Sequence, residues 1–407
     1  MTTEEIKLMS STLEKYLETY YEKVSVDNAQ NAFDDFDEQW SAIAEYMIDE
    51  TENRQSKYGQ ALVTLSVAVY ELSDTTKDKV TRLSDLINAF EKKPNVKYKF
   101  GIKKALFFNL GYCWHKVSSL YDNRAIEAFK KYVYYLVTLS SHTSYRPTVY
   151  AFRKCTKYLY KSLRKEQLNI SSPTTFNDPF DCPIIELLDN GDAIASLIHR
   201  AYKDCLKIAC FSGNIRLPYL ENPNDMFSKQ IVDEKKHKND KEEFLNGLMW
   251  AHYADSHKGV CIKYNFCDSI SNLGNDNDKI VSYFKDVKYS TKDLSVYSKK
   301  DAITLEDSFF LKGKQWEYEN ELRYLYFDLG SHSKFGTVDI PNSIEAIYFG
   351  LKCSARDKKK ILRIMKSKKH VKKDLNGSII SQKPVEFYQM EMDYEHFGQI
   401  KATKINI

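Results

Sequence analysis

The segment 316–327, WEYENELRYLYF, alternates aromatic or apolar residues with charged ones. A period of two is the pattern of a β-strand, in which successive side chains point to opposite faces. The pattern predicts a strand over 316–328 with one apolar face and one charged face, formed by Glu317, Glu319, Glu321 and Arg323. Like charges set so close repel one another unless cations lie over them. The charged face is therefore either a solvated surface, neutralised by Lys or Arg side chains of neighbouring strands, or a site.

The composition is that of a folded chain with room for more than one domain. With 407 residues, 43% of them hydrophobic and 14% aromatic, the chain can form two or three domains with their own cores. The 60 basic and 56 acidic residues leave a net charge of +4. A balance this even gives no support to a nucleic-acid-binding role for the chain as a whole.

Neither a secretory signal nor a membrane span is expected. The N-terminal sequence MTTEEIKLMSS lacks a basic and an apolar region, and the longest apolar stretch, 61–72, is too short to cross a bilayer. The eight cysteines form no CxxC pair and no common zinc pattern. Scattered cysteines in a chain without a signal are typical of reduced thiols. We therefore expect a cytoplasmic protein that does not associate with membranes.

Residues 1–145 are predicted to form an α-helical module, because proline is nearly absent and apolar residues recur at helical spacing. Within them, segment 104–136 resembles one tetratricopeptide (TPR) unit, a helix hairpin of about 34 residues. A generic helix hairpin is the alternative. Either kind is expected to bind a protein partner or an adjacent domain. The resemblance rests on Asn109-Leu110-Gly111, Trp114, Tyr121, Ala125-Ile126 and Phe129.

Residues 146–407 are predicted to form a mixed α+β domain, which a stretch rich in turn formers, SSHTSYRP, separates from the helical module. Short strand patterns alternate there with helix patterns. The predicted strands cover 149–153, 168–171, 208–211, 260–264, 281–289, 316–328, 337–340, 346–350 and 385–392, and the predicted helices cover 155–165, 192–204, 241–256, 305–312 and 355–366.

The loop 171–182, SSPTTFNDPFDC, is expected to hold an aspartate in a fixed place. Its Asn177-Asp178-Pro179 triplet favours an Asx-type turn, because the Asn side chain can bond backbone groups and proline blocks helix continuation. Asp178 or Asp181 is the residue so held. The loop is either part of a binding site or a rigid structural turn.

The segment 248–261, LMWAHYADSHKGVC, places two histidines, a tyrosine and a tryptophan within eight residues. Gly259 stands where a glycine in the left-handed conformation would end a helix. His252 and His257 are five residues apart, unlike the paired ligands of a zinc helix, so no metal is expected. Each is either a core histidine or, with Tyr253 and Trp250, part of a site for a flat polar heterocycle.

The segment 354–373 is strongly basic, with the runs RDKKK and KSKKH. Such a helix and tail are either a solvated surface or a binding surface for an anionic partner.

From about residue 148 to the C-terminus, the chain resembles the bacterial family of the domain of unknown function DUF2971. The resemblance covers roughly 200 residues in one order of motifs. It rests on Val149–Arg153, the FNDPFD motif within 168–181, Cys210-Phe211-Ser212, the motif MWAHYADSHKGVC, residues 287–289, and Lys312 leading into 316–323.

The order of these motifs is also similar to that of the ADP-ribosyltransferase fold, a split β-barrel that clamps NAD. That resemblance implies an α+β domain whose largely antiparallel sheet has a central split. It also implies that Arg153 on the first strand binds the cofactor and that Glu319-x-Glu321 lies on a late strand. The full cofactor-binding set expected is Arg153, Ser171, Ser172, Asn177, Asp178, Tyr253 and His257.

The chemistry of such a site would need carboxylates. Cleavage between nicotinamide and ribose passes through an oxocarbenium-like sugar that a nearby carboxylate stabilises. We expect Glu321 to face the developing cation and Glu319 to deprotonate the acceptor, its pKa raised by the neighbouring charge. His252 completes the expected catalytic set, and Arg153 would bind a phosphate of the dinucleotide.

The sequence thus predicts an NAD-dependent ADP-ribosyltransferase-like effector of a toxin-like or anti-phage kind. Its helical module would dock or sense a protein partner, and its acceptor would be a protein or a nucleic acid. One alternative is a metal-dependent nuclease, in which the carboxylates bind Mg²⁺ and a histidine acts as acid or base. The other is a non-enzymatic interaction protein whose glutamates are simply paired with lysines.

Overall fold

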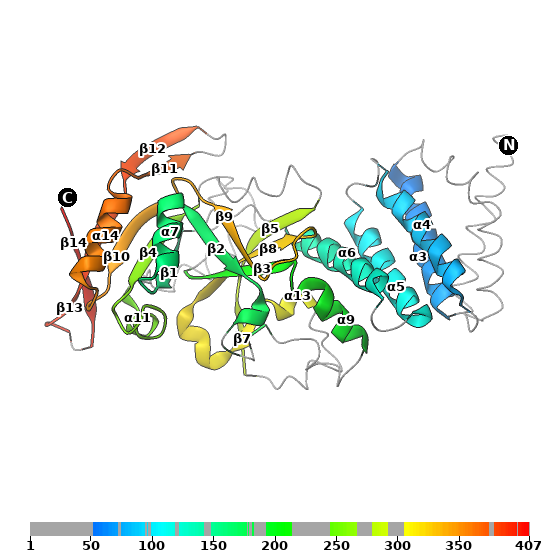
Figure 1. The fold of residues 1–407 in the computed structure, drawn as a ribbon, viewed down its shortest axis with the longest axis horizontal. Coiled ribbons are helices and arrows are strands. Elements are labelled where there is room, and N and C mark those ends of the chain that lie inside the picture. Colours follow the sequence, from blue (N-terminus) through cyan, green and yellow to red (C-terminus); the bar gives the residue numbers. More distant parts are fainter. Residues whose placement is uncertain are drawn as a thin grey trace, which may run out of the picture. The chain divides into compact units, whose positions relative to one another are not determined.

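The computed structural model describes most of the chain from residue 52 onward, and its described residues form two compact units (Figure 1). Unit 1 comprises the described residues of Met1–His142, Ile184–Cys205 and Leu329–Ser331, and unit 2 those of Thr143–Pro183, Leu206–Asp328 and His332–Ile407. The expected order, helices first and then a mixed α+β part, is confirmed. The described ranges are 52–71, 75–93, 96, 99–118, 122–141, 148–176, 178, 181–182, 193–213, 245–266, 279–291, 305–373, 378–396 and 398–406.

Unit 1 is built from amphipathic helices. In α4, the Thr76 side chain caps the N-terminus by accepting a hydrogen bond from the Lys79 amide, and the apolar residues at helical spacing are buried. The helices described in this unit are α3 (Glu52–Glu71), α4 (Lys77–Glu91), α5 (Phe100–Val117), α6 (Asn123–Ser140) and α9 (Ala193–Tyr202). Among the described residues, no helix is both long and apolar enough to span a membrane.

Helices α5 and α6 pack side by side, as the expected helix hairpin requires. Their close approach depends on Gly111, because a Cβ added there would lie 2.6 Å from the ring of Phe129, which is fully buried. Asp122 caps the N-terminus of α6 by accepting a hydrogen bond from the Arg124 amide. Whether the hairpin is a TPR unit stays a prediction.

Replacing Gly111 by alanine should lower the free energy of unfolding of the full chain by about 1–3 kcal/mol, because the new methyl group overpacks against a buried ring. Gly101→Ala is the matched control in the same helix, since a Cβ at Gly101 meets nothing within 4 Å. It should leave stability unchanged or raise it by up to about 1 kcal/mol. Urea unfolding measures both, and equal effects would contradict the close contact.

Unit 2 is organised around one large, mostly antiparallel sheet with the order β14-β13-β10-β4-β1-β3-β2-β9, in which β8 pairs with β3 and β5. Only β10 and β13 pair in parallel among the described strands of this sheet. Its strands are β1 (Thr148–Arg153), β2 (Gln167–Ser171), β3 (Leu206–Ser212), β4 (Val260–Asn265), β5 (Ile280–Asp286), β8 (Glu321–Asp328), β9 (Phe335–Asp339), β10 (Ile344–Phe349), β13 (Glu386–Met392) and β14 (Ile400–Lys404).

The sheet has a split between β1 and β3. Strand β1 pairs with β4 along its whole length, from Thr148 to Arg153, but with β3 only at Tyr150↔Ser212. Strand β3 instead pairs along its length with β8. The two halves therefore meet at one point and diverge from it, which confirms the expected split sheet.

Two helices place their apolar residues in the core of unit 2. Leu159, Tyr160 and Leu163 of α7 (Lys157–Lys165) and Ile361 and Met365 of α14 (Ala355–Met365) are buried in the same cluster as the sheet residues. The two helices pack against each other. The remaining described elements of unit 2 are η2 (Pro173–Thr175), α11 (Gly247–Tyr253), β6 (Lys288–Ser290), α13 (Leu305–Ser308), β7 (Leu311–Gly313), η4 (Lys314–Glu319), β11 (Lys369–Lys373) and β12 (Ile379–Pro384).

The strand predicted over 316–328 is wrong in its first part. Residues 314–319 form the 3₁₀ helix η4, and the strand β8 begins only at Glu321. Between them Asn320 has φ 45°, in the left-handed region that asparagine tolerates better than most residues. The helix predicted over 305–312 likewise ends at Ser308, and Leu311–Gly313 is the strand β7.

The turn after α11 also differs from expectation. Gly259 has no left-handed conformation; the positive φ values fall on Asp255, Ser256 and His257. Glycine is needed at 259 because a Cβ there would lie 2.2 Å from the carbonyl oxygen of Arg153 on the neighbouring strand. The close approach of two backbones, rather than a helix cap, explains this residue.

Candidate functional site

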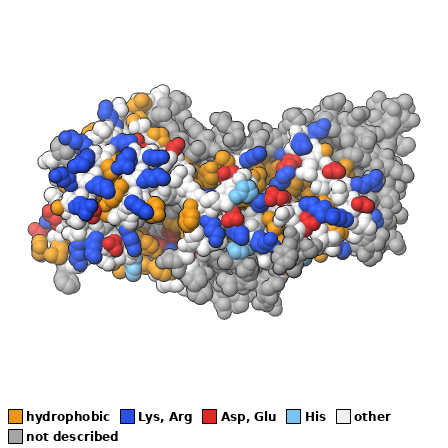
Figure 2. Space-filling model, in the orientation of Figure 1, with side chains coloured by type: hydrophobic (Ala, Val, Ile, Leu, Met, Phe, Trp, Pro, Cys, Tyr) orange, Lys and Arg blue, Asp and Glu red, His pale blue; other side chains and the backbone are white. Residues whose placement is uncertain are grey.

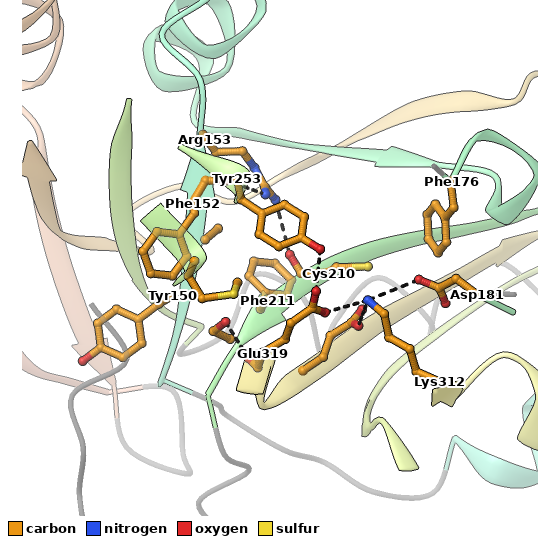
Figure 3. A pocket seen from close by; sticks show the side chains of 14 residues that line it. Tyr150, Phe152, Arg153, Phe176, Asp181, Cys210, Phe211, Tyr253, Lys312 and Glu319 are labelled. Carbon is orange, nitrogen blue, oxygen red and sulfur yellow. Dashed lines mark hydrogen bonds and ion pairs between the residues drawn. The ribbon is translucent and has the colours of Figure 1, made fainter. Parts of the chain in front are cut away.

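A pocket opens where β1 and β3 diverge (Figure 3). Its volume is about 110 Å³, and β1, β3, α11, β7, β8 and the loop after β2 all contribute to its walls. All lining residues belong to unit 2. They are Tyr150, Ala151, Phe152, Arg153, Phe176, Asp181, Cys210, Phe211, Ser212, Met249, Tyr253, Lys312, Glu319 and Glu321.

One wall of the pocket is a buried cluster of charges centred on Lys312. The Lys312 Nζ lies 2.6 Å from Glu319 Oε2, 3.1 Å from Glu321 Oε2 and 3.4 Å from Asp181 Oδ2. Figure 3 shows the side chains of Asp181 and Glu319 directed at this ammonium group from two sides. Lys312 is only 6% exposed. A single ammonium group therefore contacts three carboxylates from two segments that are far apart in sequence.

Arg323 is the second cation of the cluster, and it is fully buried. Its Nε donates to Glu321 Oε1 at 2.8 Å, and its terminal nitrogens reach Asp181 Oδ1 and the carbonyl oxygen of Phe309. The guanidinium also lies over the ring of Phe176, 5.6 Å from its centroid. A buried arginine needs this many partners, because its charge cannot be neutralised by loss of a proton.

The backbone around Glu319 and Glu321 is held from several sides. Ser212 Oγ donates to the Glu319 carbonyl oxygen at 2.7 Å, and the Gly213 amide donates to the Asn320 carbonyl oxygen at 2.9 Å. The Glu321 amide donates to the hydroxyl of Tyr289 at 2.8 Å. Because Asn320 is left-handed, Glu319 and Glu321 both reach Lys312 although only Glu321 lies on a strand.

Glu321 is ionised over the whole physiological range. Burial alone would raise its pKa, but the charge and hydrogen bonds of Arg323, together with Lys312, lower the pKa to about 2. Its folded pKa lies below the ordinary value of 4.5. Its ionised form therefore stabilises the fold above pH 4.5, and that contribution is lost as the pH falls toward 2.

The pKa of Glu319 is shifted in the opposite direction. Burial raises its pKa above the ordinary value, and the opposing hydrogen bonds from Lys312 and Tyr253 do not cancel that effect. The charge of Glu321 acts in the same direction as burial. A raised pKa means that the folded state favours the protonated form, so stability from this group is lost as the pH rises through its pKa. Of the two glutamates, Glu319 is the one suited to exchange a proton.

Tyr253 and Arg153 line the other walls of the pocket. The Tyr253 hydroxyl donates to Glu319 Oε1 at 2.5 Å, and burial and this carboxylate raise the pKa of the phenol. Arg153 NH1 donates to the Phe152 carbonyl oxygen at 3.1 Å, and NH2 donates to that of Cys210 at 3.4 Å. The second bond spans the opening between β1 and β3. Within the described residues, Arg153 forms no ion pair, so its charge is available to an anion.

The structure brings together four of the residues proposed from sequence, namely Arg153, Tyr253, Glu319 and Glu321. His252 is exposed and does not line the pocket. It directly precedes Tyr253 on the helix, and adjacent helical residues point about 100° apart. Its ring lies 6.2 Å from that of Tyr318.

His257 also lies outside the pocket lining. Its ring stacks on Trp250 at 6.3 Å, and burial together with Lys352 lowers its pKa. Its carbonyl oxygen accepts a hydrogen bond from the Lys352 amide. These contacts are those of a histidine that fixes a turn.

The serine and loop residues proposed for cofactor binding do not line the pocket either. Ser171 ends β2, and Ser172 caps η2, its hydroxyl accepting from the Thr174 amide. Asp178 accepts a backbone hydrogen bond from the Asp181 amide. Asn177 lies outside the described residues, so the Asx-type turn stays a prediction. Of the two aspartates that the loop offered, Asp181 reaches the pocket.

Sequence reasoning did not assign a role to Lys312, Arg323 or Cys210. Lys312 is one of 60 basic residues, and no spacing rule links it to Asp181, 131 positions earlier. The one indication of a role in the sequence was that Lys312 and Cys210 both belong to the motifs that carry the family resemblance. Arg323 was placed on the charged face, where its pairing with Glu321 two residues earlier follows from strand geometry.

Comparison with known proteins gives one match, which covers part of the pocket region. The family model described as protein of unknown function (DUF2971) matches residues 249–324. This match confirms the DUF2971 resemblance, over the segment that supplies Tyr253, Lys312, Glu319 and Glu321. No curated protein and no solved structure matches the chain.

Replacing Lys312 by methionine should lower the free energy of unfolding by about 3–5 kcal/mol at pH 8, because buried carboxylates lose their shared cation. The loss should shrink toward pH 5, as Glu319 takes up a proton. Urea unfolding at the two pH values measures it.

Lys314→Met is the matched control, two residues away. Lys314 pairs with Glu317 at 2.5 Å, but both side chains are 49% exposed. An exposed pair contributes about 0–1 kcal/mol. Similar losses for Lys312→Met and Lys314→Met would contradict the buried cluster.

Proposed function

We propose that the pocket of unit 2 binds the nicotinamide riboside end of NAD and cleaves its glycosidic bond, for transfer of ADP-ribose to an acceptor or to water. The observation that carries the proposal is the meeting of Arg153, Tyr253, Glu319 and Glu321 at one pocket in a split sheet. Arg153 and Glu321 are 168 residues apart in sequence, so only the fold brings these residues together.

The charge distribution of the pocket supports this substrate. With Glu319 ionised, three carboxylates face two cations, Lys312 and Arg323, so the cluster has one net negative charge. A net negative wall stabilises a positively charged sugar as the bond to nicotinamide breaks. Arg153 supplies a positive charge on the β1 wall, which suits a phosphate. NAD has the same polarity, with a cationic ring at one end and a diphosphate beyond it.

The two glutamates take different roles in this proposal. Glu321 stays ionised and faces the developing cation, since Arg323 fixes its orientation and keeps its pKa low. Glu319, with its raised pKa, accepts the proton of the attacking acceptor. Tyr253 orients Glu319 through its hydroxyl.

The size of the pocket bears on how NAD binds. A volume of about 110 Å³ is below the range of about 300–1,000 Å³ that encloses drug-sized ligands. It suits one ring and part of a sugar. The rest of the dinucleotide would then lie along the opening between β1 and β3, past Arg153.

The other proposals concern the biological setting. A helical unit that contributes no residue to the pocket suits the docking or sensing of a protein partner. Toxin-like or anti-phage activity is the setting that we propose for such a pairing.

Incubation of the protein with NAD and a cell lysate should release nicotinamide or transfer ADP-ribose. Glu321→Gln and Glu319→Gln should each lower the rate by at least about 100-fold, because each removes a charge or base used in the transition state. Glu317→Gln, on the same segment but exposed and paired with Lys314, should retain the wild-type rate.

Two outcomes would contradict this function. One is that neither product forms under any condition. The other is that Glu317→Gln and Glu321→Gln, both folded by circular dichroism, have the same rate. The same preparations are assayed for cleavage of DNA and RNA with Mg²⁺, the reaction of the nuclease alternative. The engagement of the pocket carboxylates by Lys312 and Arg323 favours NAD chemistry over Mg²⁺ binding.

The pH dependence of the reaction rate should reflect the titration of Glu319. Its raised pKa predicts that the rate falls on the acid side from a pH above 4.5, as the base becomes protonated. Tyr253→Phe removes a hydrogen bond that lowers this pKa, so the acid limb should move to higher pH. An acid limb that Tyr253→Phe leaves in place would show that another group titrates.

A further inference from the structure

The exposed sides of α7 and α14 form a concentrated basic face on unit 2. Helix α7 carries four basic residues and no acidic one, and α14 carries five basic residues and one acidic residue, Asp357. The whole chain, in contrast, has a net charge of only +4. Figure 2 shows Lys and Arg side chains gathered over the part of unit 2 where α7 and α14 lie. We propose that this face binds the sugar-phosphate backbone of nucleic acid.

The nine basic side chains of this face outnumber its one carboxylate, Asp357, whose charge interacts with Arg356 and Lys360. None of the basic side chains on α7 or α14 forms an ion pair with a described carboxylate, and the nearby pair Lys368–Glu166 involves residues outside both helices. Asp357 accepts its hydrogen bonds from Tyr160 and Ser354. Such an excess of cations on two packed helices attracts a polyanion and releases its counterions.

The apolar residues of the helices favour nucleic acid over a lipid surface. A membrane-binding helix inserts an exposed apolar side into the lipid. Here Leu159, Leu163, Ile361 and Met365 are buried in the core of unit 2. The one large apolar or aromatic side chain that these helices expose is Tyr158, at 64%, with Lys157 Nζ 5.2 Å from its ring centroid. An exposed aromatic ring among cations suits the stacking of an unpaired base.

The basic face begins close to the pocket. Arg153 lines the pocket at the end of β1, and α7 starts only four residues later, at Lys157. Four residues span at most about 14 Å of extended chain. If the proposed NAD reaction holds, nucleic acid is then the nearest class of acceptor. That consequence rests on the proposed function, whereas the binding itself does not.

The test is binding of fluorescein-labelled duplex DNA, single-stranded DNA and RNA to the full chain, without NAD, as a function of salt. For the wild type, the logarithm of the binding constant should fall linearly with the logarithm of the salt concentration. The triple variant Lys161→Glu/Lys359→Glu/Arg363→Glu should bind at least 10-fold more weakly, and its salt slope should be smaller by about 2–3. Helix propensities of Glu, Lys and Arg are similar, so the helices should persist.

Lys279→Glu/Lys334→Glu/Lys401→Glu is the matched control. It makes the same change in net charge at exposed residues outside α7 and α14, and should bind within about twofold of wild type. Urea unfolding verifies that both triple variants are folded. Equal binding by wild type and the α7/α14 variant, or equal losses in both variants, would overturn the proposal. So would binding to phosphatidylserine vesicles without binding to any nucleic acid. Because NAD is absent, failure here leaves the pocket proposal standing.

Discussion

Three buried carboxylates coexist in unit 2 because Lys312 and Arg323 lie among them. Asp181, Glu319 and Glu321 come from a loop, the end of a 3₁₀ helix and a strand, and the two cations join these segments. Removing one partner of such a buried network is costly, because it leaves a charge without compensation. The arrangement of this wall therefore depends on the two cations.

The split between β1 and β3 opens the pocket that this cluster lines. If β1 and β3 paired along their full length, the carbonyl of Cys210 would bond to a strand and not to the Arg153 side chain. The divergence places the Arg153 guanidinium, which forms no ion pair among the described residues, on one side and the carboxylate wall on the other. The same strand that carries Arg153 leads into α7, where exposed basic residues continue over the surface. One stretch of chain thus connects the pocket with the basic face.

Much of the fold could be predicted from periodicity, since strands such as β1 and β4 and helices such as α14 fall where expected. The shared orientation of Glu319 and Glu321 was also expected, yet it arises differently. The alternation in 316–320 suited a strand, whereas the left-handed Asn320 ends a 3₁₀ helix there. Lys312 and Asp181 could not be placed at the site from sequence, because only tertiary structure joins them. The basic run in 354–373 was visible in the sequence, but only the packing of α7 against α14 joins it to the basic residues of 157–165 in one face.

We propose that the divergence of β1 and β3 forms an NAD site with Arg153 and Glu321 on opposite sides. A crystal structure of the full chain soaked with NAD, or with a non-hydrolysable analogue, tests it most directly. We expect the nicotinamide riboside between Tyr253 and the Glu319–Glu321 wall, with the diphosphate at Arg153. Density for NAD elsewhere on the chain, or a pocket left empty at saturating NAD, would contradict it.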